Sequence, residues 1–137
     1  MPHYTFMDYA PGGRSVIADW LNEYRENIRV QIHSGLVAII HRAWAVEDLT
    51  LPRFEKLKGA HRDLIAVRLE RDKVQYRVFA CAGVGLPLAR VWLLAGGTES
   101  NNRYRPTGAL ETALARRAAI IGNPNLVRPT CLLEETS

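Results

Sequence analysis

The chain has few of the residues that mark disulfide-rich, metal-binding or membrane-spanning proteins. Among its 137 residues are two cysteines and four histidines. Cys81 and Cys131 show no metal-ligand spacing, so we expect free thiols, no metal and no cofactor. His33 and His41 stand eight apart on a predicted helix, where a structural role is commoner than a metal site. No uncharged run is long enough to cross a bilayer, so we expect no membrane partner.

The chain also lacks a linker, an internal repeat and a low-complexity segment. Apolar residues make up 47% of it, enough for an ordinary core. We therefore expect a single domain over residues 1–137, with its core in residues 15–121 and a loose tail over 122–137. The first residues, MPHYTFMDYAPGGR, have neither the basic start nor the apolar centre of a secretion signal, which predicts a cytoplasmic protein.

Apolar periodicity predicts the helices. Between residues 15 and 44 apolar side chains recur every three or four positions, which is typical of amphipathic helix. Ser15 is a suitable N-cap, and a break at residues 25–27, with Asn27 capping the second helix, predicts a helical pair. A last helix is expected over residues 109–121, and a short first strand over residues 3–8.

After Gly59 the apolar period drops to two. Residues 65–69 and 74–78 predict a β-hairpin with its turn at 71–73, and residues 89–95 predict a third strand. Residues 96–108 predict a long polar loop. This order predicts an α+β fold, a small antiparallel sheet packed against an N-terminal helical pair and a C-terminal helix. The helical residues Trp20, Leu21, Tyr24, Ile28 and Ile32 should pack on the sheet face bearing Val67, Leu69, Val78 and Leu93.

Positive charge is concentrated in one segment. Residues 53–77 hold eight Lys and Arg against four Asp and Glu, so their net charge of +4 (8 − 4) equals that of the whole chain. A patch of this kind attracts polyanions such as nucleic acid. The alternative is a solvated sheet edge kept soluble by its Lys and Arg.

Several short strings follow one another along residues 15–120. They are Trp20-Leu21, Lys56-Leu57-Lys58-Gly59, Val67-Arg68, Tyr76-Arg77-Val78-Phe79, Val91-Trp92-Leu93-Leu94, Pro106, and Glu111 with Ala115 and Arg116. Their order and spacing resemble the RelE superfamily of toxins from bacterial toxin–antitoxin pairs, in particular its HigB-like and phage-derived branch. The order carries the resemblance, since each string occurs often by chance.

The resemblance implies a RelE-like fold and a metal-independent endoribonuclease that cuts mRNA, usually on the translating ribosome. It also implies a cognate antitoxin, often a helix-turn-helix DNA-binding protein. In such a reaction the 2′-hydroxyl attacks the adjacent phosphate, and fixed cations neutralise the charge that grows there. A lysine among other cations can have its pKa lowered enough to act as a base.

Arg68, Arg77 and Lys58 are the candidate catalytic residues. We predict that both arginines share one face of the sheet, away from the helix-packed core. Like charges facing each other are costly, and a phosphate between them would relieve that cost. The alternative is that each arginine pairs with an acid on the helices.

The candidate RNA-binding residues are Lys56, Arg62, Arg103, Tyr104 and Arg105. Tyr104 is suited to stack on a base while its arginine neighbours hold phosphates. The alternatives are plain solubility for the cations before the hairpin and an ordinary surface loop for residues 103–105.

Two positions depart from the family pattern. Ala66 stands where a glutamate is common, and residues 95–102 stand where a lysine pair commonly follows the last strand. Three functions therefore stay open. They are an endoribonuclease toxin, a catalytically inactive RelE-like module that binds nucleic acid or a protein partner, and a phage-derived structural or assembly protein.

Overall fold

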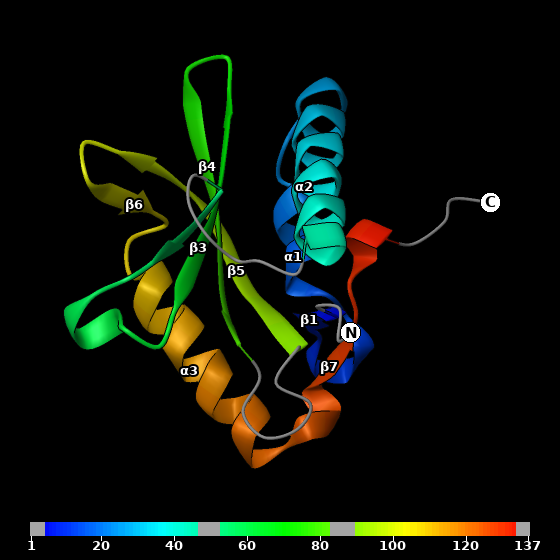
Figure 1. Cartoon of the computed structure of the whole chain (residues 1–137), viewed down its shortest axis with the longest axis vertical. Coiled ribbons are helices and arrows are strands. Elements are labelled where there is room, and N and C mark those ends of the chain that lie inside the picture. The colour runs from blue at the N-terminus through cyan, green and yellow to red at the C-terminus, as the bar shows by residue number, and fades with distance from the viewer. Residues whose placement is uncertain (1–4, 47–52, 83–89, 134–137) are drawn as a thin grey trace.

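The computed structural model describes residues 5–46, 53–82 and 90–133, which form a sheet with helices on both faces (Figure 1). In chain order the elements are β1 (Thr5–Tyr9), η1 (Pro11–Gly13), α1 (Val16–Leu21), α2 (Glu26–Val46), β2 (Phe54–Lys56), η2 (Gly59–His61), β3 (Ile65–Arg71), β4 (Val74–Ala82), β5 (Arg90–Ser100), β6 (Arg103–Arg105), α3 (Ala109–Gly122), η3 (Pro124–Leu126), β7 (Val127–Pro129) and η4 (Cys131–Leu133). The loop expected at 47–52 and the turn expected at 83–87 lie outside the described residues.

Seven strands form one mixed sheet. Their order is β2-β3-β4-β5-β1-β7, and β6 pairs with the end of β5. All pairs are antiparallel except β1 and β5, which run parallel from Thr5 opposite Arg90 to Asp8 opposite Leu93. The α+β class is confirmed, but the expectation of an antiparallel sheet is wrong. The chain between β1 and β5 runs through α1, α2 and three strands, and such a long connection, unlike a tight turn, lets β1 run parallel to β5.

Two tight turns define the hairpins. Asp72 and Lys73 join β3 to β4 with φ of 50° and 68°, and Asn101 and Asn102 join β5 to β6 with φ of 51° and 62°. Positive φ at both central residues suits the right-handed twist of the flanking strands. The first hairpin matches the prediction. The second replaces the loop expected over 96–108, and its signal was the Asn pair, which tolerates left-handed backbone.

The helices follow the predicted pattern closely. Ser15 caps α1, since its Oγ accepts a hydrogen bond from the Ala18 amide at 3.1 Å. The helical pair breaks at residues 22–25, so α2 begins at Glu26, one residue before the expected cap at Asn27. In the described part of the chain, no helix has the length and apolar character needed to span a membrane.

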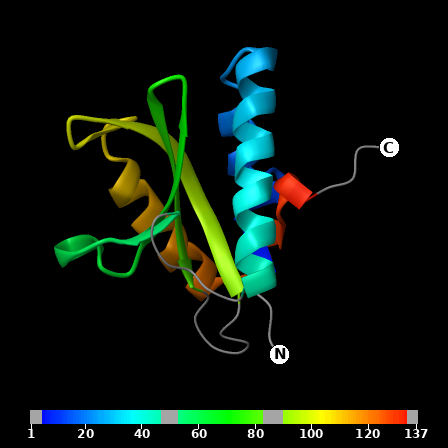
Figure 2. The same cartoon turned by 45° about the horizontal axis from the view of Figure 1, so that its top comes forward.

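Each face of the sheet has its own apolar core. Figures 1 and 2 show α1 and α2 over one face and α3 over the other. The first core confirms the predicted packing of Trp20, Leu21, Tyr24, Ile28 and Ile32 with Val67, Leu69, Val78 and Leu93. The second core, under α3, includes Leu64, Ala66, Phe79, Cys81, Trp92, Leu94, Ala113 and Ile120.

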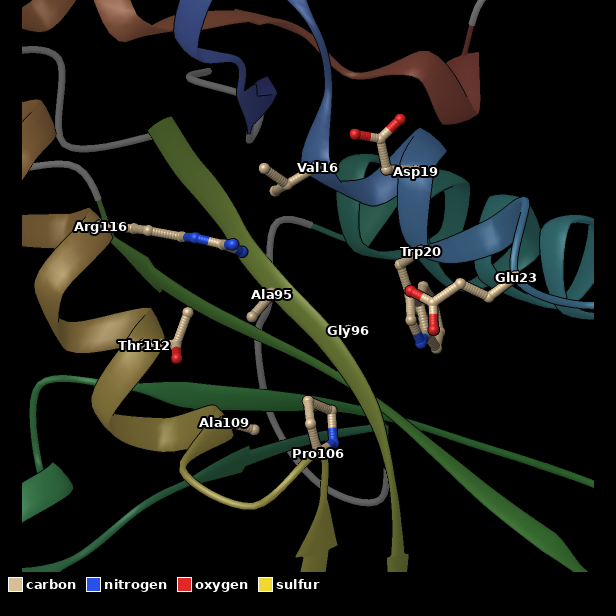
Figure 3. A pocket seen from close by; sticks show the side chains of 10 residues that line it. All are labelled: Val16, Asp19, Trp20, Glu23, Ala95, Gly96, Pro106, Ala109, Thr112 and Arg116. Atoms are coloured by element: carbon tan, nitrogen blue, oxygen red, sulfur yellow. The ribbon is translucent and has the colours of Figure 1, made fainter.

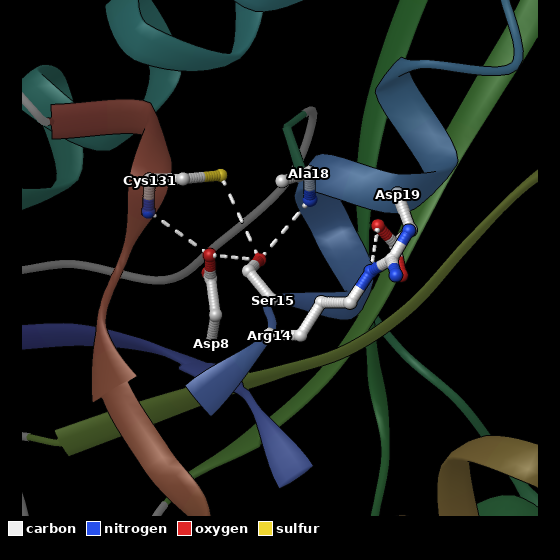
Figure 4. A network of polar contacts seen from close by, with 6 residues as sticks. All are labelled: Asp8, Arg14, Ser15, Ala18, Asp19 and Cys131. Carbon is white, nitrogen blue, oxygen red and sulfur yellow. Dashed lines mark hydrogen bonds and ion pairs between the residues drawn. The ribbon is translucent and has the colours of Figure 1, made fainter. Parts of the chain in front are cut away.

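The C-terminal segment belongs to the fold as far as residue 133. Strand β7 pairs with β1, and Leu132 is buried. The buried carboxylate of Asp8 accepts hydrogen bonds from Ser15 Oγ at 2.7 Å and from the Cys131 amide at 2.9 Å (Figure 4). One carboxylate therefore joins β1, the start of α1 and the C-terminal segment. The expectation of a loose tail is wrong for these residues, because contacts 123 residues apart in sequence hold it.

Candidate nucleic-acid interface

The face of the sheet under α3 changes from apolar to polar along β3 and β4. Ala66 pairs with Phe79 inside the core, and two residues further on Arg68 pairs with Arg77. Opposite residues of a ladder lie on the same side of the sheet. Gln75 stands opposite Glu99, and Glu99 opposite Tyr104, so three neighbouring strand pairs contribute. The polar face consists of Arg68, Glu70, Gln75, Arg77, Glu99 and Tyr104.

Arg77 is buried at the centre of the polar face, with its side chain 4% exposed. Its Nε donates to Glu99 Oε1 at 2.9 Å, its Nη1 to the Tyr76 carbonyl at 3.0 Å and its Nη2 to Gln75 Oε1 at 2.8 Å. This guanidinium is neutralised and offers little surface to a phosphate. Arg77 therefore pairs with an acid, but this acid is not on a helix. Its partner lies on β5, in the segment predicted to be a loop.

Arg68 has a different environment from Arg77, although the two stand opposite each other. Their shared face is confirmed, and it is the face opposite α1 and α2. The Arg68 side chain is partly buried and makes no hydrogen bond or ion pair with any of the described residues. Arg68 is thus the cation of this face that remains available to an anion.

Tyr104 joins the polar face from β6. Its ring packs edge-on against Phe79, with ring centres 5.1 Å apart. Burial raises the pKa of Tyr104, and the charges of Glu99 and Glu55 raise it further, while Arg77 and Arg68 act in the opposite direction. The phenol therefore stays protonated at neutral pH and can donate a hydrogen bond to an anion.

Arg103 and Arg105 lie on the other side of β6. Successive side chains of a strand point to opposite faces, and these two stand opposite Ser100 and Thr98 of β5. With Ser100 and Asn101 they line a cavity of about 370 Å³ at the end of the hairpin. The structure therefore brings the two arginines together but separates them from Tyr104. An RNA strand held by all three would have to cross the edge of the sheet at β6.

The cations before the hairpin lie on and around η2. Lys56 ends β2, Lys58 precedes η2 and Arg62 follows it, and all three are exposed. Figures 1 and 2 place η2 and β6 on the side of the sheet away from α2.

Two contacts missed from the sequence hold the η2 region against α3. His61 Nε2 lies 3.1 Å from Glu111 Oε2, and Arg117 Nη1 lies 3.8 Å from Asp63 Oδ2. Both join residues about fifty apart in sequence, and no local pattern reveals such a pairing. They position the η2 cations at the border of the polar face.

Comparison with known proteins found no match to a family model, to a curated protein or to a solved structure. The polar face, the cations around it and the strings that resemble the RelE superfamily are therefore the features that bear on function.

Proposed function

We propose that the protein binds single-stranded RNA at the polar face and acts as a RelE-type toxin that cleaves mRNA. The main support for this proposal is the environment of Arg68. Arg68 is a partly buried cation with no partner among the described residues, placed opposite an arginine that Glu99 already neutralises. Partial burial of an unpaired charge costs free energy, and an RNA phosphate at this position would offset that cost.

The chemistry of this proposal requires no metal. The 2′-oxygen of the RNA forms a bond to the adjacent phosphorus and gives up its proton to water. The bond from phosphorus to the 5′-oxygen breaks, and the 5′-oxygen takes a proton from Tyr104, which water then restores. Arg68 would neutralise the phosphorane, and Arg77, bonded to Glu99 and Gln75, would act as a positioning residue that holds the polar face in shape. Tyr104 would donate a proton or a hydrogen bond, and Lys58, Lys56 and Arg62 would bind the RNA backbone.

One observation favours the second candidate, an inactive RelE-like module that binds RNA without cutting it. Arg77 is buried and uses three of its five N–H donors on Glu99, Tyr76 and Gln75. A related observation is that Ala66 provides no carboxylate that could serve as a base. In that case Arg68 and the η2 cations bind RNA phosphates, and no strand scission follows.

The test uses the purified chain with end-labelled single-stranded RNA, and compares Arg68→Ala with Arg90→Ala. Arg90 is an exposed arginine at the start of β5, so its replacement makes the same charge change away from the polar face. Loss of one phosphate-directed cation should lower cleavage by roughly a hundredfold or more. Arg90→Ala should leave cleavage near the wild-type rate.

Three outcomes separate the candidates. Products ending in a 2′,3′-cyclic phosphate, together with growth arrest when the chain is expressed without a partner, support the toxin. Salt-sensitive RNA binding that needs Arg68 but gives no cut ends supports the binding module. Absence of RNA binding, or equal losses in the two variants, would overturn both.

A further inference from the structure

A cavity lies where the outer edge of β5 has no strand partner. β1 pairs with residues 90–93 of β5, and β6 pairs with residues 98–100. Between them, among the described strands, residues 94–97 have no neighbour on this edge. α1 approaches this stretch from one face of the sheet and α3 from the other, and a cavity of about 210 Å³ separates the two helices (Figure 3).

The backbone of β5 is adapted to this cavity. The register with β4 shifts here, so that Phe79 stands opposite Ala95 and Ala80 opposite Leu93, which leaves Leu94 unmatched. Such bulges recur beside functional sites because they change the direction of neighbouring groups. Gly96 is also required, since a Cβ there would overlap the Trp20 ring. The Trp20 ring can therefore lie directly against the strand and form one wall.

The α3 wall carries a positive charge. Arg116 extends from α3 towards β5 (Figure 3). Its Nη1 donates to the Leu94 carbonyl at 2.7 Å, and its guanidinium lies 5.5 Å from the centre of the Tyr9 ring. Burial lowers the pKa of Arg116 from its ordinary value, but an arginine remains charged in proteins. These contacts fix the guanidinium and use one of its five N–H donors.

The wall formed by α1 and the turn after it carries negative charge. Glu23 and Trp20 both line the cavity on this side, across from Arg116 (Figure 3). Glu23 forms no ion pair with a described residue. Asp19, on the same wall, is paired with Arg14 at 2.9 Å. The cavity thus has on one side a solvent-exposed carboxylate with no ion-pair partner among the described residues, and on the other a guanidinium with spare donors.

We propose that this cavity binds a small zwitterion of the size of a free α-amino acid. Its carboxylate would accept hydrogen bonds from Arg116, its ammonium group would pair with Glu23, and its side chain would contact Trp20 and Pro106. A simple anion would leave Glu23 unpaired, and a simple cation would leave Arg116 unpaired. The volume lies below the range of roughly 300–1,000 Å³ typical of sites for drug-sized ligands. This site is separate from the polar face and does not depend on RNA binding.

The experiment titrates the purified chain with each of the common α-amino acids by calorimetry. Concentrations up to about 10 mM detect dissociation constants in the millimolar range. At least one amino acid should bind, and its N-acetyl and carboxamide derivatives, which each lack one charge, should bind at least about tenfold more weakly. Failure of the whole panel to bind, or equal binding of the blocked derivatives, would overturn the proposal.

A matched pair of variants locates the site. Glu23→Gln removes the free carboxylate and should weaken amino-acid binding about tenfold or more. Glu26→Gln makes the same change at an exposed residue of α2 that does not line the cavity, and binding should be unchanged. If amino-acid binding survives Glu23→Gln, the ligand lies elsewhere and the assignment is wrong.

Discussion

The two faces of the sheet are built from the same strands but are covered to different extents. Helix α2 has 21 residues and is roughly 31 Å long, and with α1 it covers its face as far as Leu69 and Tyr76. Helix α3 has 14 residues and is roughly 21 Å long. The core beneath it ends at Ala66 and Phe79. Beyond those residues the side chains are polar.

The alternation of side chains along β3 and β4 therefore has a different result on each face of the sheet. On the α2 side every second residue enters an apolar core. On the α3 side the same alternation leads from core residues to Arg68 and Arg77, and Arg77 is buried by polar neighbours instead of by a helix. The polar groups of this face must therefore form hydrogen bonds or ion pairs with one another or with a ligand. Arg77 is bonded to its neighbours on this face, and we propose that Arg68 binds a ligand.

The largest expected effect tests the helix-covered face. Trp20→Ala should lower the free energy of unfolding by about 3–5 kcal/mol, because it removes a buried aromatic ring from the contact between α1 and β5. Val30→Ala on α2 is the control, since Val30 is 57% exposed and should cost at most about 0.5 kcal/mol. Urea unfolding followed by circular dichroism measures both. Equal costs would mean that this face is not the main core.

The next prediction tests the polar face. Glu99→Ala leaves the Arg77 guanidinium buried without its partner and should cost about 2–4 kcal/mol, somewhat less than for a fully buried pair because Glu99 is partly exposed. Glu70→Ala is the control, because Glu70 is an exposed acid of the same face that forms no ion pair with a described residue, and it should be nearly neutral. The same unfolding experiment applies. If Glu99→Ala is as mild as Glu70→Ala, the polar face does not depend on this ion pair.

The parts of the fold that could be predicted from sequence are those with local signals. Helical periodicity located both helices of the N-terminal pair, and alternation with a short polar turn located the β3–β4 hairpin. The pairing of Arg68 with Arg77 followed from the register of that hairpin. Tyr104 and its two neighbours were identified as a group, but only strand geometry shows that they divide between two faces.

The features that could not be predicted depend on contacts distant in sequence. Glu99 reaches Arg77 only because β4 pairs with β5. Asp8 fixes the C-terminal segment through Cys131, at the far end of the chain. The cavity beside Arg116 exists because β1 and β6 leave part of one edge of β5 uncovered. No periodicity or motif encodes such a gap, since it arises from the arrangement of three strands and two helices.

A smaller effect is expected from the contact between α1 and β5. Gly96→Ala places a methyl group against the Trp20 ring and should cost about 1–3 kcal/mol through overpacking. Gly122→Ala at the end of α3 meets no atom within 4 Å and should be neutral or slightly stabilising. Thermal unfolding of the two variants compares them. A neutral Gly96→Ala would show that Trp20 does not lie against the strand.

The smallest effect concerns the half of the second face that α3 does cover. Burial raises the pKa of the Cys81 thiol from 9.0 to about 12, although Arg117 acts in the opposite direction. Below pH 9 the thiol is protonated in both states and its burial is favourable. Between about pH 9 and 12 the unfolded chain loses this proton and the folded chain keeps it, so stability falls as the pH rises. Near pH 10 the loss from this group should be about 1.4 kcal/mol.

Cys81→Ala isolates this contribution, because the loss of unfolding free energy from pH 8 to pH 10 should be smaller in the variant than in the wild type. Tyr24, Tyr76 and Tyr104, whose pKa values burial also raises, contribute equally to both proteins and cancel in the comparison. Cys81→Ser, which also removes the titrating thiol, should show the same smaller loss as Cys81→Ala. An unchanged pH dependence in Cys81→Ala would mean that α3 leaves this part of the sheet open to water, so that the covered and uncovered halves of the face would no longer differ.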